Sequence, residues 1–154
     1  MSATTAPSVK AELLTLIQAD ATLSAIQSTY AYPGQSIAQE ALFYGRTIGT
    51  ENPDSMGQRK QRERYEVQVY IYVALDSDDP QTCETRCWDL VSALENLVRA
   101  NNSNTGALSA ALKDNLGGNA AGWVVYGGTE MTPFAYSGQR VCEALCKINV
   151  TAIK

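Results

Sequence analysis

The sequence contains no histidine and no long apolar run. Histidine is the commonest general base and the commonest metal ligand, so its absence removes the usual catalytic and metal-binding constellations. No apolar stretch approaches the ~20 residues that a membrane span needs. The N-terminal segment MSATTAPS lacks the basic start and apolar core of a signal peptide. We therefore expect a soluble protein, made in a cytoplasm, that is no enzyme and holds neither a metal nor a cofactor.

Motifs that bind phosphate or calcium are also missing. The stretch Gly45-Arg46-Thr47-Ile48-Gly49 lacks the lysine and the spacing of a P-loop. The acidic turn at residues 76–79 resembles half of a calcium loop, but no glycine or distal glutamate follows at the right offset. Carboxylates at that place are typical of the start of a helix, where the macrodipole favours negative charge. Serine and cysteine nucleophiles have no histidine to activate them.

Length and charge limit the remaining classes. A chain of 154 residues is one domain by the usual size relation, and an apolar fraction of 45% is ordinary for a globular protein. A net charge of -4 argues against a dedicated nucleic-acid binder. We expect residues 1–8 to form a flexible arm and residues 9–154 to form a single domain.

Two long segments alternate between apolar and polar residues in the manner of half-buried strands. In Arg64–Leu75 the odd-numbered residues are apolar or aromatic, and the other face is partly polar because it also carries Tyr70 and Tyr72. In Arg140–Ile153 the face that begins at Cys142 is entirely apolar. We expect Val67, Val69, Ile71 and Val73 to be buried against an apolar helical stripe formed by Cys87, Val91, Leu94 and Val98.

Helix signals lie between the strand segments. Asp79 suits a helix N-cap and Pro80 suits the first helical position, so a long helix is expected from there to about Ala100. The pattern is typical of an α+β fold, with an antiparallel or mixed sheet built on a long β-hairpin and helices packed on one face. The other expected elements are a helix at Val9–Ala19 capped by Ser8, an extended piece at 30–34, strands at 41–44 and 123–126, a break at Gly127-Gly128 and a helix at 107–115.

The most polar segment, Thr50–Gln61, lies between two expected strands and contains Pro53 and Gly57. We interpret residues 49–64 as a long hairpin loop. A hairpin needs only two to five connecting residues, and a surplus of this size is often functional.

A basic run, formed by Arg59, Lys60, Arg62 and Arg64, flanks this loop. Two readings stay open for it: contact with a phosphate backbone or an acidic partner surface, or a solvated flank beside Glu63 and Glu66. Exposed aromatic residues outside the core stripes often serve interfaces. The candidate interface residues are Arg46, Arg59, Lys60, Arg62, Arg64 and Trp88.

Four cysteines occur in two pairs, Cys83/Cys87 on the expected long helix and Cys142/Cys146 on the last strand. Four residues of strand span roughly 13 Å, so the second pair cannot bind one zinc ion unless the strand is broken there. All four point to expected core faces and are most simply explained as small buried hydrophobes. A disulfide between the helix and the sheet is the alternative.

The order of elements, with short stretches inside them, carries a family resemblance. The stretches are the apolar set Leu13, Leu16 and Ile17, then Asp20-Ala21-Thr22-Leu23, Phe43-Tyr44-Gly45, the polar loop, Arg62–Val67, the acidic turn before Glu84–Arg99, and the terminal strand. This layout, from about residue 9 to residue 153, resembles the tail-terminator or tail-completion proteins of tailed bacteriophages and related contractile particles. The four cysteines and the basic run depart from the family pattern.

The resemblance implies a structural role in a virion. Members of that family are small α+β proteins that form hexameric rings, cap the finished tail tube and join it to the head–tail connector. The implied partners are further copies of this chain, a tail tube protein and a connector or stopper protein, with DNA passing through the lumen and no membrane. The implied location is the tail or neck of a virion assembled in the cytoplasm of a bacterial host, where the loop 49–64 would reach a neighbouring subunit or ring.

Two other functions remain open at this point: another neck or head-completion protein, and a small cytoplasmic enzyme or ligand-binding module. Mass in solution separates a ring former from a small enzyme. Contacts in a closed ring are head-to-tail, so each subunit shows two different patches. We expect one patch to contain the basic run and the other to be acidic.

Overall fold

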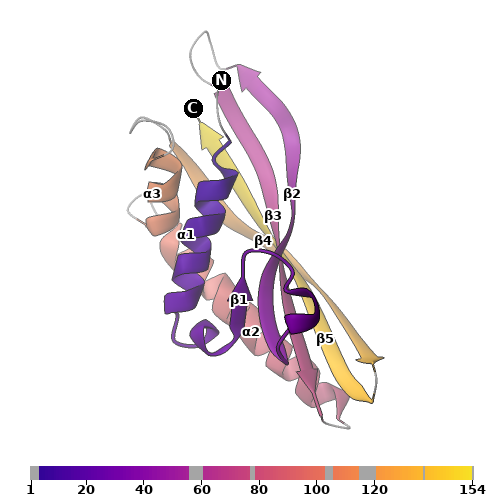
Figure 1. Ribbon diagram of the computed structural model, residues 1–154. Coiled ribbons are helices and arrows are strands. Elements are labelled where there is room, and N and C mark those ends of the chain that lie inside the picture. Colours follow the sequence, from indigo (N-terminus) through magenta and orange to yellow (C-terminus); the bar gives the residue numbers. More distant parts are fainter. Residues whose placement is uncertain are drawn as a thin grey trace.

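A five-stranded mixed sheet carries the fold, as the sequence predicts (Figure 1). The computed structural model describes residues 4–55, 61–76, 79–102, 106–114, 121–136 and 138–153. The strands are β1 (Gln27–Thr29), β2 (Glu40–Ser55), β3 (Gln61–Leu75), β4 (Ala121–Tyr136) and β5 (Gln139–Ile153). The helices are α1 (Ala6–Ala19), α2 (Pro80–Asn101) and α3 (Ala107–Asp114), with short 3₁₀ turns η1 (Leu23–Ala25) and η2 (Gly34–Ser36).

The strands are arranged in the order β1-β2-β3-β5-β4. The pair β1–β2 is parallel and the other pairs are antiparallel, so the α+β expectation with a mixed sheet is confirmed. The three helices cover one face of this sheet (Figure 1). The segment between β1 and β2 lies on the other side of β2.

The core forms between α2 and the two central strands. Val67, Val69, Ile71 and Val73 of β3 are at most 1% exposed, and the predicted stripe of α2 belongs to the same cluster of buried residues. The predicted start of α2 is confirmed, because the Asp79 carboxylate accepts a hydrogen bond from the Gln81 backbone N–H at 3.0 Å. The two-residue period of β3 and the helical period of α2 therefore meet in one apolar layer.

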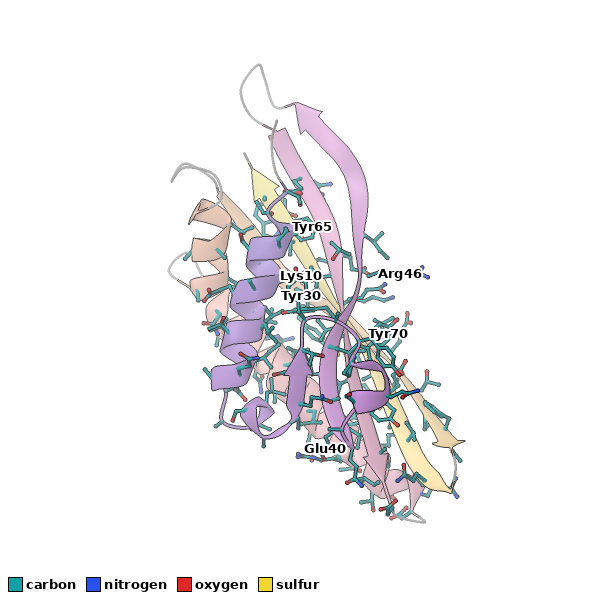
Figure 2. The ribbon with its side chains drawn as sticks, viewed as in Figure 1. Lys10, Tyr30, Glu40, Arg46, Tyr65 and Tyr70 are labelled. Atoms are coloured by element: carbon teal, nitrogen blue, oxygen red, sulfur yellow. The ribbon has the colours of Figure 1, made fainter. Side chains whose placement is uncertain are left out.

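The first helix begins earlier than predicted, at Ala6, with Thr5 and not Ser8 at the N-cap position. Thr5 is fully buried, and its backbone N–H and its hydroxyl each donate to the Glu63 carboxylate at 3.1 Å. The Tyr65 hydroxyl lies 2.9 Å from the Thr5 hydroxyl, and Figure 2 shows Tyr65 beside the start of α1. Residues 6–8 are thus helical and do not belong to an arm, because a side chain from β3 takes the place of a local cap.

Replacing Glu63 with Ala should lower the free energy of unfolding by about 1–3 kcal/mol. The substitution leaves the buried Thr5 N–H and hydroxyl without their acceptor, and it removes a negative charge from the N-terminus of α1. Chemical denaturation would measure the effect, with Glu12→Ala, a half-buried glutamate in the middle of α1, as the matched control. Equal stability of the two variants would mean that Glu63 does not hold α1 to the sheet.

The predicted long loop at 49–64 is wrong in its extent. β2 continues to Ser55 and β3 begins at Gln61, so most of the segment is a two-stranded ladder that extends beyond the helices (Figure 1). Its register shifts between Glu51 and Asp54, which accommodates Pro53, a residue that cannot donate to the ladder. The segment is mostly polar in sequence, and the backbone pairing of β2 with β3 extends along it without an apolar alternation.

The predicted break at Gly127-Gly128 is also wrong. β4 runs through both glycines, and its pairing with β5 shifts by one residue between Tyr126 and Gly128. Gly128 has a φ of 136°, a backbone conformation that favours glycine. The glycine pair is therefore a bulge inside an edge strand, and Pro133 is tolerated farther along because the outer side of β4 has no partner strand among the described residues.

The segment after α1 differs from the prediction as well. The residues expected to be extended, 30–34, are not a strand: β1 lies before them, at Gln27–Thr29. The 3₁₀ turn η2 begins at Gly34, which has a φ of 65°. β1 pairs only with residues 41–43 of β2. The outer edge of β2 from residue 45 onward therefore has no partner strand in the part of the chain that the structure describes.

Candidate interaction surface

The candidate interaction surface is the face of the sheet opposite the helices, which we call the outer face. Side chains alternate along a strand, so the residues of β3 and β5 that do not enter the core share this face. Tyr70 of β3 lies between Phe43 of β2 and Leu145 of β5. One step along the strands, Tyr72 lies beside Glu143.

Aromatic rings cover one end of the outer face. Phe43 and Tyr70 are stacked, with centroids 5.5 Å apart and 17° between the ring planes. Tyr32 meets Phe43 edge-on at 5.2 Å, while Tyr30, two residues earlier, packs on Tyr44 of the helix side at 5.4 Å. Figure 2 shows Tyr30 near α1 and Tyr70 on the side away from it. The chain thus wraps around the edge of β2, and aromatic pairs hold it on both faces.

A groove of about 600 Å³ opens where this wrapped segment meets the end of the sheet. Its one ionisable carboxylate belongs to Glu143, which is half-buried and makes no hydrogen bond or ion pair with any described residue. Burial raises the pKa of this carboxyl above its ordinary value. The groove is lined by Tyr32, Gly34, Gln35, Ile37, Phe43, Tyr72, Phe134 and Glu143.

Arginine and exposed apolar side chains occupy the other end of the outer face. Arg62 and Arg64 follow the same alternation as Tyr70, and Arg64 lies beside Thr151, which lies beside Trp123 of β4. Trp123 is 47% exposed and Val125 is 44% exposed. Exposed aromatic side chains and arginines are both enriched at protein interfaces.

The structure brings together some of the predicted interface residues. Arg46 is exposed, points away from the helices (Figure 2) and shares the outer face with Arg62 and Arg64, which are half-buried. Trp88 is 43% exposed but lies on the polar side of α2, where its indole N–H lies 3.4 Å from Glu84, so it is not part of the outer face. Arg59 and Lys60 lie outside the described residues.

Other residues of the surface were not among the sequence predictions. Trp123 and Val125 alternate with buried Val124, and Phe134 follows farther along the same edge strand with 42% exposure. The alternation in 123–126 was a usable signal for a strand with one exposed apolar face. No sequence signal could show that nothing in the described chain covers this face.

The four cysteines are free thiols, all buried. The Cys83 thiol lies 3.4 Å from the Arg140 carbonyl oxygen, and the Cys87 thiol lies 3.9 Å from the Cys142 carbonyl oxygen, so the helix pair rests directly on β5. Burial raises the pKa of each of the four thiols. The interpretation of all four as small core residues is confirmed, and the disulfide alternative is not.

The native protein should therefore react slowly with thiol reagents. Only the thiolate is nucleophilic, and burial disfavours it while also blocking access. We expect no more than a trace of modification by Ellman's reagent in buffer, and reaction of all four thiols in denaturant. A rapid reaction of one thiol in the native state would mean that this thiol is more accessible than its burial indicates.

The described residues include neither a metal-binding cluster nor a helix that could span a membrane. Within the described ranges, no cluster of three or more cysteine and acidic side chains could hold a metal ion. None of the helices in the same ranges is both long and apolar enough to cross a membrane.

Comparison with known proteins gives a likeness of fold. No protein-family model matches the chain, and no curated protein matches it either. A chain in a solved structure described as a virion of a native gene transfer agent particle superposes with a TM-score of 0.53 and 14% sequence identity. The match covers 97% of this chain and 99% of that one. At this identity the likeness concerns the fold, and this protein has the fold of a component of that particle.

Proposed function

We propose that this protein is a structural virion protein with no catalytic role. The observation that carries the proposal is the shared fold with a chain of a gene transfer agent virion, which extends over nearly the whole of both chains. The outer face supports it, because Trp123, Val125 and Phe134 expose apolar surface that a free monomer would normally bury. The pairing of exposed aromatics with arginine is typical of protein interfaces.

We infer more specifically that it is a tail terminator, a ring that caps the tail tube and joins it to the head–tail connector. A closed ring needs two dissimilar surfaces on each subunit. The arginine end and the groove end of the outer face differ in charge and in shape. The free edges of β2 and β4 add unpaired backbone groups at the two sides of the sheet, among the residues described.

The proposed partners follow from the tail-terminator role. Identical subunits form the ring, hexameric by analogy with the resembled family, and the tail tube protein and the connector or stopper protein bind its two ends. The ladder of β2 and β3 beyond the helices is the part that reaches a neighbour (Figure 1). Arg62 and Arg64 contact either an acidic surface of a neighbouring protein or the phosphate backbone of the DNA that passes through the lumen.

A second placement keeps the same structural role. Another neck or head-completion position is compatible with the fold likeness, because that likeness is to a particle component and not to one position.

The test is the location of the chain in particles from cells that carry its gene. A gold-labelled antibody against this chain should mark the junction of head and tail, and cells without the chain should accumulate unjoined heads and tails. Label on tailless heads, with none on isolated tails, would favour the head-completion position. Absence of the chain from purified particles, together with normal particles in its absence, would overturn the structural role.

A further inference from the structure

The groove around Glu143 has the chemistry of a receptor for a cation. Glu143 is half-buried and has no partner among the described residues, so its carboxylate loses hydration energy. A positive group placed beside it would offset part of that loss. Aromatic faces attract a guanidinium or an ammonium ion, and the walls of this groove are aromatic. The nearest lysine on this face along β5, Lys147, is already bound to Glu130 at 2.7 Å.

The basic run of the same chain cannot supply that cation. Arg62 and Tyr72 are ten residues apart on the uninterrupted pairing of β3 with β5, a separation of roughly 33 Å at ~3.3 Å per residue. Arg62 pairs with the last residues of β5, while Glu143 lies near its start. The cationic end and the anionic groove are thus at opposite ends of one face, which suits contact between two copies.

We propose that the groove around Glu143 binds Arg62 and Arg64 of a second copy of this chain, with the arginine side chains entering between the aromatic walls. Charge complementarity selects this occupant, since Arg62 and Arg64 lie at one end of the outer face and the Glu143 carboxylate lies in the groove at the other end. The inference rests on the proposed ring and names its two contact patches. It accounts for the basic run, which the resembled family does not explain.

Complementary charge reversal tests the proposal. One variant carries Glu143→Lys and keeps its basic run, and the other carries Arg62→Glu with Arg64→Glu and keeps its groove. Sedimentation velocity would measure self-association of each full-length variant alone and of an equimolar mixture. Each variant alone should associate at least tenfold more weakly than the unaltered chain. The mixture should recover association to within about threefold, because every contact then joins opposite charges.

Glu143→Gln removes the charge with little change of shape and should also weaken association, while Glu12→Gln on α1 should not. Thermal melts of all variants check that each is folded. If the unaltered chain associates but the mixture is as weak as its components, the groove assignment is wrong and the ring proposal stands. If the unaltered chain stays monomeric, both fail.

Discussion

Replacing Ile71 with Ala should lower the free energy of unfolding by about 2–5 kcal/mol, the usual cost of a large-to-small change in a packed core. Ile71 is fully buried near the middle of β3, between Leu42 and Ala144 on the neighbouring strands. It belongs to the same buried cluster as Leu94 of α2. The shortened side chain would leave a cavity between the sheet and α2 that the surrounding side chains cannot fill.

The matched control is Ile48→Ala, the same substitution at a β2 position that is 40% exposed on the outer face. Its cost should stay near or below about 1 kcal/mol, because little apolar area leaves the interior. Denaturant unfolding at one fixed protein concentration would measure both, since self-association also adds to stability. A loss below half a kcal/mol for Ile71→Ala would mean that the buried face of β3 is the other one.

Reversing the charges of Arg62 and Arg64 together should weaken particle assembly at least a hundredfold and leave the subunit folded. The expectation rests on the cost of like charges at a contact, several kcal/mol for each close pair. Both residues lie on the outer face, on the side of β3 opposite its core positions, so the reversal leaves the core side chains unchanged. The measurement is the fraction of tails joined to heads, with a thermal melt of the purified variant beside it.

Arg99→Glu is the control, because it reverses the charge of an exposed arginine on α2, on the helix side of the sheet and away from both ends of the outer face. This control should assemble normally. Normal joining of heads and tails in the Arg62 and Arg64 variant, with an unchanged melt, would rule out the basic run as an interface.

Local signals in the sequence were sufficient for most of the core. The cap at Asp79, the apolar stripe of α2 and the alternation in β3 each depend on neighbouring residues, and the structure has them as predicted. The start of α1 was missed because its acceptor, Glu63, is 58 residues away in the chain. The interface residues remain predictions, because no observation here tests them.

The hairpin of β2 and β3, and strand β4, show a second limit of prediction from the sequence. Polar residues, Pro53 and the glycines at 127 and 128 are all typical of loops, and they predicted loops. Backbone hydrogen bonds nonetheless extend both strands, since a bulge absorbs the proline in one and the glycine pair in the other. These stretches lack a continuous apolar alternation in the sequence, so composition alone could not distinguish them from loops.

If this protein acts by assembling, native mass spectrometry of the purified full chain over a range of concentrations will detect the assembly. We expect a closed oligomer whose mass is an integer multiple of the 16.6 kDa chain, hexameric in the proposed ring, and which dissociates as salt screens the arginine contacts. A monomer at every concentration would contradict a role in assembly.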